Sequence, residues 1–210
     1  MRQLDELRHL FRDFALKAET VVLNLDDDET RLLAAALPAE KLRTYAIEDK
    51  SADLVGTDIE EAPFAVAFRV GSVDVRLQVP GRHNVENALA ALAACGAAGV
   101  PLDEAAQALS GFTGLRRRFE LVGEARGIKV IDDFGHNPDK IAATLRTLHA
   151  FPGRLLLFFQ PHGYGPLKTM KDELVATFAQ GMTEEDVLIM PDPVYYGGTV
   201  ERTVGSAAVI

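Results

Sequence analysis

The strongest constraint on the fold is an alternation of apolar runs and helical segments in the second half of the chain. Ile128–Ile131, Arg154–Gln160 and Asp186–Met190 are short runs rich in branched or aromatic residues, and helical patterns over 138–148 and 168–180 separate them. An uninterrupted apolar run such as RLLLFFQ favours a strand that is covered on both faces. The order strand, helix, strand, helix, strand predicts an α/β fold with a doubly wound, Rossmann-like parallel sheet.

The first half of the chain predicts a further α/β unit. An amphipathic helix that needs an apolar partner is expected over residues 3–18, because Leu4, Leu7, Leu10, Phe11 and Phe14 recur at helical spacing. Strands are expected at 21–25 and 43–47, with a helix between them that ends at Pro38, and a hairpin is expected over 64–79 around the turn Gly71-Ser72.

Three aspartates, Asp26, Asp27 and Asp28, end the first predicted strand. One interpretation is a metal site. The other, which we favour, is a solvated turn whose negative charge stabilises the start of the next helix. No metal site is therefore predicted from these residues.

Composition narrows the classes of partner. The chain has 210 residues and a formal net charge of −9, which disfavours nucleic acids and membrane surfaces and favours small molecules. No apolar run reaches the roughly 18 residues of a membrane helix, and the acidic N-terminal segment is unlike a signal peptide. The single cysteine, Cys95, excludes an internal disulfide, and the expected compartment is the cytoplasm.

The stretch GRHNVENALAALAACGAAGV, which follows Pro80, reads as a glycine turn and a small-residue helix. In one interpretation Asn84 caps this helix and the alanines allow close packing. In the other, His83, Asn84 and Asn87 present imidazole and amide groups to a ligand such as a purine ring. The pattern leaves both interpretations open.

The stretch from Arg116 to Pro138 gathers many polar groups around two predicted strands and the start of a helix. The strands, Leu121–Val122 and Ile128–Ile131, flank the turn Gly123–Gly127 and are expected to form a hairpin or to lie next to each other. Asp132 and Asp133 end the second strand, and Asn137 is expected to cap the helix that Pro138 begins. The aspartates could accept hydrogen bonds from ribose hydroxyls, and one arginine of the RRR run could pair with phosphate. An aspartate pair that caps a loop and a solvated arginine run explain the pattern equally well. Further along the chain, His162, Tyr164 and Asp192 follow predicted strands, at the edge where such sheets bind ligands.

Four linked segments, GRHNVENALAALAA, GLRRRFELVG, IDDFGHNPDKI and FFQPHGYGPLKTMKDEL, resemble the Mur ligase family in this order and at these intervals. Their motifs are most similar to the UDP-N-acetylmuramate:L-alanine ligase branch. The resemblance covers residues 4 to 192. It implies that residues 1–112 are the second part of a central ATP-binding domain, and that 113–210 are an incomplete Rossmann-like C-terminal domain.

Members of this family use ATP and Mg²⁺ to activate a carboxylate as an acyl phosphate, which an amino acid's amine attacks. The resemblance therefore implies ATP as cofactor, and a UDP-sugar carboxylate and an amino acid as substrates. It assigns His83, Asn84 and Asn87 to the adenine side of the ATP site, Arg118 to the nucleotide, Asp133 to the ribose, and His136 and His162 to the neighbourhood of the amino acid. It assigns no catalytic residue within this chain.

The chain also departs from the family's pattern. Asn137 stands where the branch commonly has a second histidine, and Gly163 and Pro166 stand where it has two arginines suited to a carboxylate. No G-x-x-x-x-G-K-[ST] loop occurs, so the ligands for phosphate and Mg²⁺ are expected upstream, in a longer parent protein. A fragment that is inactive alone is the leading hypothesis. The alternative is a non-catalytic module that binds a nucleotide or a protein partner.

Overall fold

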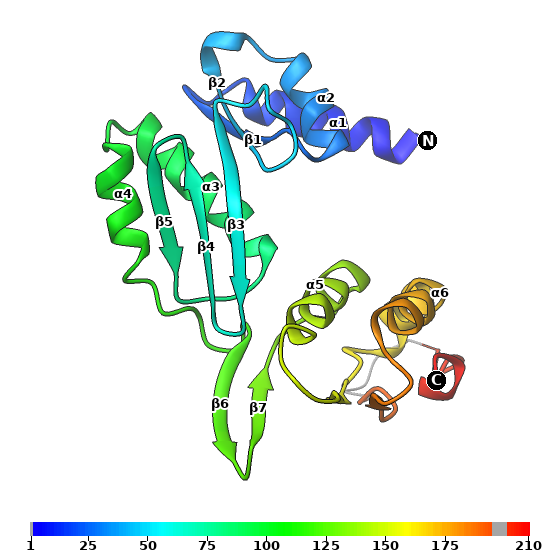
Figure 1. Ribbon diagram of the computed structural model, residues 1–210. Coiled ribbons are helices and arrows are strands. Elements are labelled where there is room, and N and C mark those ends of the chain that lie inside the picture. Colours follow the sequence, from blue (N-terminus) through cyan, green and yellow to red (C-terminus); the bar gives the residue numbers. More distant parts are fainter. Residues whose placement is uncertain (1, 195–200) are drawn as a thin grey trace. The chain divides into compact units, whose positions relative to one another are not determined.

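The computed structural model describes residues 2–194 and 201–210. The chain divides into two compact units, Met1–Thr113 and Gly114–Ile210. Each unit has a mixed α/β architecture, and the two are described in turn (Figure 1).

The first unit is built around a mixed sheet. Its elements are α1 (Arg2–Ala15), β1 (Val21–Asn24), α2 (Asp28–Ala35), a 3₁₀ turn η1 (Ala39–Lys41), β2 (Leu42–Ala46), β3 (Leu54–Ala62), β4 (Ala65–Val70), β5 (Val73–Leu77), α3 (Arg82–Ala97) and α4 (Leu102–Leu109). The strand order is β1-β2-β3-β4-β5. The pairs β1–β2 and β2–β3 are parallel, whereas β3–β4 and β4–β5 are antiparallel. A parallel half thus continues directly into a three-stranded meander.

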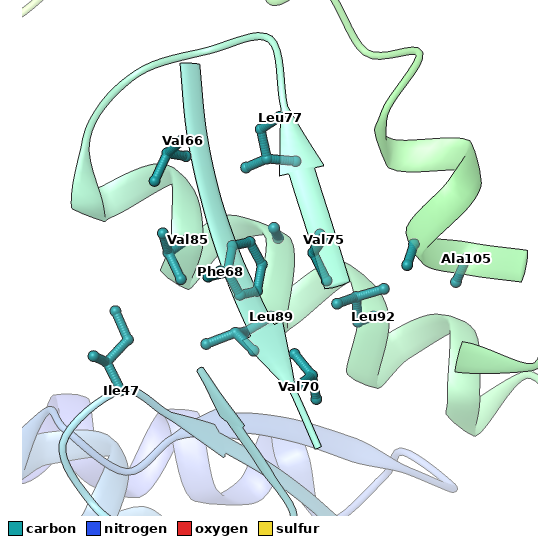
Figure 2. Packing of buried hydrophobic residues seen from close by; sticks show 12 residues of the cluster. Ile47, Val66, Phe68, Val70, Val75, Leu77, Val85, Leu89, Leu92 and Ala105 are labelled. Carbon is teal, nitrogen blue, oxygen red and sulfur yellow. The ribbon is translucent and has the colours of Figure 1, made fainter. Parts of the chain in front are cut away.

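Helix α3 provides the core of this unit because its small and branched residues allow close approach to the sheet. Val85 and Leu89 are fully buried, and Figure 2 shows them gathered around Phe68 of β4. Gly56 of β3 permits this contact. A Cβ at that position would lie 3.1 Å from Leu89 Cδ1 and 3.3 Å from Val85 Cγ1, which is tighter than ordinary packing.

The sequence missed one long strand of this sheet. The predicted strands at 21–25 and 43–47 and the predicted hairpin over 64–79 are confirmed as β1, β2 and β4–β5. Strand β3 was not predicted. Its register against β4 shifts between Thr57 and Glu60, where Asp58 has a φ of 49°. This bulge interrupts the alternation of polar and apolar residues by which strands are recognised.

Helix α1 keeps most of its apolar stripe in solvent within the described residues. Leu10, Phe11 and Phe14 are 63%, 56% and 75% exposed. The helix is tied to α2 by Arg8, whose guanidinium donates to both carboxylate oxygens of Glu29 at 2.6 and 2.7 Å. The predicted helix is confirmed, but the described residues cover only part of the apolar face that the sequence expected to be buried.

The second unit contains two separate pairs of strands. Its elements are β6 (Glu120–Ala125), β7 (Ile128–Asp132), α5 (Pro138–Leu148), β8 (Leu156–Phe158), α6 (Tyr164–Gly181), β9 (Val187–Ile189) and a 3₁₀ turn η2 (Ser206–Ala208). Strands β6 and β7 form an antiparallel hairpin, and β8 and β9 pair in parallel. Helices α5 and α6 pack against each other and share one apolar core, made of Ile141, Leu145, Leu167, Leu174, Phe178, Met190 and Val209.

The parallel pairing predicted for this half is confirmed by β8 and β9, and the adjacent strands predicted on either side of the Gly123–Gly127 turn are confirmed as the hairpin β6–β7. Because β7 belongs to this hairpin, the described parallel sheet has two strands and not the three that the alternation predicted. Leu156 and Phe158 are 62% and 69% exposed, so the residues that the structure describes cover β8 on one face, whereas the apolar run had predicted that both faces are covered. Helix α6 begins at Tyr164, earlier than predicted, because Gly163 acts as its N-cap. No helix among the described residues is long and apolar enough to cross a membrane.

Candidate functional site

The loop between β7 and α5, which begins with Asp133 and Phe134, is hydrogen-bonded to the turn Arg117–Phe119 that precedes β6. Two hydrogen bonds join them: Phe119 N donates to Asp133 Oδ2 at 2.9 Å, and Phe134 N donates to Arg117 O at 2.9 Å. Arg118, between these two anchor points, donates its own amide to Leu115 O at 3.2 Å. The turn that carries the arginines is therefore fixed by the loop that carries the aspartates.

Asp133 is the centre of this arrangement. Besides Phe119 N, its carboxylate accepts Gly135 N at 2.7 Å and the hydroxyl of Thr144 at 3.2 Å. A Cβ at Gly135 would approach Asp133 Oδ1 to 2.8 Å, so a side chain there would displace this carboxylate from its present position. A carboxylate has about four acceptor positions, so three protein donors leave Asp133 capacity for roughly one more hydrogen bond.

The backbone of this turn is strained on both sides of Arg118. Arg117 and Phe119 have φ values of 59° and 50°, in the left-handed region that side chains other than glycine rarely occupy. The Phe119 ring is buried and lies 6.0 Å from the Phe151 ring, which anchors that end of the turn. Such conformations persist where neighbouring contacts hold them in place.

The side chains of Arg117 and Arg118 both lie over the Phe134 ring. Their Cζ atoms are 4.8 and 5.6 Å from the ring centroid. Arg117 Nε is also 3.8 Å from Asp132 Oδ2. Within the described part of the chain, the Arg118 guanidinium has neither an ion pair nor a hydrogen bond. Arg118 thus retains its donors for an anion from outside.

Two histidines extend this cluster. The centroid of the His136 ring lies 5.2 Å from that of the Phe134 ring and 6.3 Å from that of the His162 ring. His136 Nδ1 is 3.1 Å from Phe134 O, and since a carbonyl oxygen can only accept, this hydrogen bond requires a proton on Nδ1. In the neutral ring Nε2 is then the acceptor. The predicted site residues Arg118, Asp133, His136 and His162 therefore gather within the second unit.

The remaining predicted site residues lie at the start of α3 in the first unit. Gly81, with a φ of 92°, is the N-cap, so of the two interpretations left open for this segment, the one in which Asn84 caps the helix is wrong on this point. Asn84 lies inside the first turn and donates Nδ2 to Pro80 O at 2.7 Å, which ties the helix to the loop before it. Asn87 donates to Asn84 Oδ1 at 3.2 Å, and its side chain is exposed. His83, half-buried, begins this same face.

The three aspartates after β1 have separate structural roles. Asp26 accepts Ile47 N at 2.6 Å, Glu48 N at 3.1 Å and Asp49 N at 2.9 Å. Burial raises the pKa of Asp26, but the three backbone donors together hold it below its ordinary value. Asp27 caps α2 by accepting Thr30 N at 2.9 Å, and Asp28 pairs with Arg31. The prediction of helix N-terminal charge is confirmed, although half-buried Asp26 does not lie in a solvated turn.

One important residue of the cluster was missed by the sequence analysis. Phe134 is the common contact of both arginines and His136. Asp132, which the sequence offered beside Asp133 as a ribose ligand, is the carboxylate beside Arg117. The signal for Phe134 was its position: an aromatic residue directly after two aspartates at a strand end, downstream of an arginine run. The contact itself depends on a turn that spacing along the chain does not predict.

Two family models match successive parts of the chain. Residues 4–95 match the model described as "Mur ligase middle domain", and residues 117–201 match "Mur ligase, glutamate ligase domain". Together the two matches take in most of the first unit and most of the second.

Curated relatives match nearly the whole chain. The UDP-N-acetylmuramate--L-alanine ligase of Agathobacter rectalis is 33% identical over 97% of this chain and 45% of its own length. The protein of the same name from Geobacter sp. is 37% identical over 90% of this chain and 42% of its own length. The chain thus spans less than half the length of these relatives.

Solved structures show the same architecture. UDP-N-acetylmuramate-alanine ligase from Thermotoga maritima superposes with a TM-score of 0.66 at 25% identity, over 89% of this chain and 46% of that one. MurF from Acinetobacter baumannii superposes with a TM-score of 0.69 at 25% identity, over 80% of this chain and 38% of that one.

Proposed function

The chain belongs to the Mur ligase family, and we propose that it carries the nucleotide-binding residues of an ATP-dependent ligase. That ligase joins an amino acid to a UDP-N-acetylmuramate-type carboxylate in the synthesis of peptidoglycan precursors. The names of the curated relatives support this substrate class. We further propose that residues 1–112 are the later part of a central ATP-binding domain and that 113–210 belong to a C-terminal domain.

The observation that carries the proposal is the Arg118 guanidinium, which has no carboxylate partner among residues 2–194 and 201–210. Held over an aromatic ring in a fixed turn, this cation suits a phosphate group, because guanidinium donors match phosphate oxygens in geometry and charge. Asp132 ends β7, and Asp133 follows it in the loop that is hydrogen-bonded to the Arg118 turn, so a phosphate and a ribose could be bound side by side. We assign Arg118 to the phosphates and Asp133, through its remaining acceptor position, to the ribose.

The start of α3 is proposed to bind the adenine. Asn87 is exposed and its amide can both donate and accept, as an adenine edge requires. Asn84 is held against the preceding loop and in turn orients Asn87. His83 completes this group of adenine-side residues. The assignment of these three residues to the adenine rests on the family membership.

In the proposed reaction the substrate carboxylate attacks the γ-phosphorus of ATP, which gives an acyl phosphate and releases ADP. The amine then attacks the acyl carbon, the bond to the phosphate oxygen breaks, and the amine loses a proton, which yields the amide and phosphate. His136 and His162 are proposed to lie near the amine. His136 Nε2 is free to accept a hydrogen bond there, since Nδ1 donates to Phe134 O.

The phosphate-cradling loop and the Mg²⁺ ligands are assigned to polypeptide outside these 210 residues. No G-x-x-x-x-G-K-[ST] sequence occurs among them, and backbone amides of such a loop normally surround the transferred phosphates. We therefore expect these residues to bind nucleotide but not to transfer phosphate without that loop. Mg²⁺, when bound, would neutralise charge on the β- and γ-phosphates.

The identity of the amino-acid substrate has to be determined by experiment, because this chain lacks the two arginines that related enzymes have at the positions of Gly163 and Pro166. Gly163 and Pro166 offer no guanidinium for a carboxylate. Screening ADP release against a panel of amino acids, with UDP-N-acetylmuramate as the carboxylate, identifies the amine substrate. Release that requires both the carboxylate and one amine supports the ligase. ADP release that needs neither would contradict it.

Nucleotide binding tests the site itself. Titration of ATP by calorimetry should show that Arg118→Ala weakens binding about tenfold or more, as expected for a hydrogen-bonded charge pair. Arg154→Ala, which removes an exposed arginine from the same unit, serves as the matched control. Equal affinity of the two variants would refute the assignment. Nucleotide binding without amide formation under every substrate combination would instead favour the non-catalytic module.

A further inference from the structure

The two arginines over the Phe134 ring are not equivalent. Arg117 Nε lies 3.8 Å from Asp132 Oδ2, so part of its charge is compensated by a carboxylate on the neighbouring strand. The Arg118 guanidinium lies over the same ring and has no ion pair or hydrogen bond within the residues that the structure describes. Arg117 therefore belongs to the frame of the site, whereas Arg118 is the group that remains available to a ligand.

The ring is attached to the backbone of the turn that it supports. Phe134 N donates to Arg117 O, so the residue that carries the ring is hydrogen-bonded to the residue that carries the first guanidinium. Asp133, next to Phe134, accepts Phe119 N on the other side of Arg118. The two bonds enclose Arg118, and the left-handed φ values of Arg117 and Phe119 lie at these anchor points.

We propose that Phe134 is a positioning residue, whose ring holds the Arg118 guanidinium in the orientation in which it meets the nucleotide phosphates. This inference rests on the proposed function. The face of an aromatic ring carries negative electrostatic potential and attracts a guanidinium without using its N–H donors. A carboxylate in the same place would compete with phosphate for those donors. The ring instead orients the cation and leaves its donors free.

The size of the effect follows from the exposure of the site. The Phe134 side chain is 37% exposed, and cation–π contacts at exposed sites correspond to about a two- to fivefold change in an equilibrium constant. Loss of the contacts to both arginines should therefore weaken nucleotide binding by roughly tenfold. The affinity should fall through faster dissociation, because the long-range charge that attracts the nucleotide is unchanged.

Three variants at this position separate the ring's electrostatics from its volume. Phe134→Leu keeps an apolar side chain but removes the ring, and it should raise the ATP dissociation constant by roughly tenfold. Phe134→Tyr and Phe134→Trp keep an aromatic face and should bind ATP within about twofold of the original protein. Phe158→Leu is the matched control, because it removes an exposed aromatic ring from β8 in the same unit.

A second measurement tests the stacking without nucleotide. The Nε–H and Cδ–H signals of Arg117 and Arg118 in NMR spectra should show upfield ring-current shifts, which Phe134→Leu abolishes and Phe158→Leu leaves in place. A residue that only fills space would not restore both the shifts and the affinity when replaced by another aromatic residue. Joint loss in Phe134→Leu and joint recovery in Phe134→Tyr support the proposal.

The outcomes distinguish this proposal from the function on which it rests. If Arg118→Ala weakens ATP binding but Phe134→Leu does not, the positioning role is overturned and the proposed nucleotide site stands. Absence of ring-current shifts in the original protein overturns the positioning role as well. If neither Arg118→Ala nor Phe134→Leu changes ATP affinity, the nucleotide site itself is refuted, and the positioning role with it.

Discussion

The carboxylate of Asp133 accepts the backbone amide of Phe119 at 2.9 Å, and this bond joins the strand end that carries the aspartates to the turn that carries Arg118. Asp133 therefore serves the structure as well as any ligand. Its other two donors, Gly135 N in the loop before α5 and the Thr144 hydroxyl within α5, hold the same carboxylate against this part of the second unit.

Removal of the Asp133 side chain should destabilise the second unit. Asp133→Ala leaves two backbone amides without their acceptor, and we expect a loss of about 2–3 kcal/mol in the free energy of unfolding. Thr144→Val removes one of the three hydrogen bonds and should cost about 1 kcal/mol. Urea unfolding followed by circular dichroism measures both. If Asp133→Ala unfolds at the same urea concentration as the original protein, the structural role is wrong.

Asn137 explains one departure from the family's usual motif in structural terms. Its Oδ1 accepts Lys140 N at 3.0 Å and so caps α5, with Pro138 as the first helical residue. Asn137→Ala should cost about 1 kcal/mol, and Asn137→Asp should be close to neutral because a carboxylate also caps and suits the helix N-terminus. Hydrogen exchange of the first amides of α5 provides the measurement. Faster exchange in Asn137→Asp than in Asn137→Ala would contradict this role.

Gly56 and Leu89 should be coupled energetically because they are in contact across the first unit's core. Leu89→Ala removes a fully buried side chain and should cost about 3 kcal/mol. Gly56→Ala places a Cβ 3.1 Å from Leu89 Cδ1 and should cost about 1–2 kcal/mol. In the double variant the added methyl group enters the space that Leu89 leaves. The double variant should therefore lose at least about 1 kcal/mol less stability than the sum of the two single losses.

A glycine at which an added Cβ would contact none of the described residues provides the control for that experiment. A Cβ at Gly123 of β6 would meet nothing within 4 Å, so Gly123→Ala should change stability by no more than about 0.5 kcal/mol. Strict additivity of Gly56→Ala and Leu89→Ala would show that α3 and β3 do not pack as described.

The first unit should lose stability in acid through Asp26. Burial alone would raise its pKa, but the backbone donors of Ile47, Asp49 and Glu48 bring the folded-state pKa below the unfolded value. The resulting stabilisation is present above an ordinary aspartate pKa of about 3.9 and is lost as the pH falls through the folded pKa. Urea titrations between pH 6 and 2, at low salt, should show a steeper decline for the original protein than for Asp26→Asn. Identical slopes would contradict this.

Much of the fold could be predicted from the sequence because its local signals agree with the final packing. Asn137-Pro138 marks the start of α5, and the turn Gly71-Ser72 marks the β4–β5 hairpin. Strand β3 was missed because its second half, DIEEA, is charged and contains the bulge at Asp58. The sequence predicted that β8 is covered on both faces, but the apolar run shows only that these residues favour burial. It does not show which other segments pack against the strand.

The sequence predicted which residues belong to the candidate site better than it predicted how they contact one another. The density of arginines, aspartates and histidines drew attention to the right stretch, and the four second-unit residues assigned from the family resemblance do lie together. The sequence could not predict that Asp133 accepts the Phe119 amide while Asp132 lies beside Arg117, because this depends on the direction of the Phe119 N–H. The ring beneath the two guanidinium groups likewise follows from a left-handed turn at Arg117, which has no local sequence signal.

The loop Ile47–Asp49 presents three consecutive amides to one carboxylate, and this makes Asp26 an internal ligand of an anion receptor made from backbone. Converging amides of this kind bind phosphate, sulfate or chloride where no side chain supplies the charge. In Asp26→Ala the receptor would lose its own anion while the β2–β3 connection that forms it remains. Chloride or sulfate should then partly restore stability in that variant, which turns a structural hydrogen-bond network into a site that responds to salt.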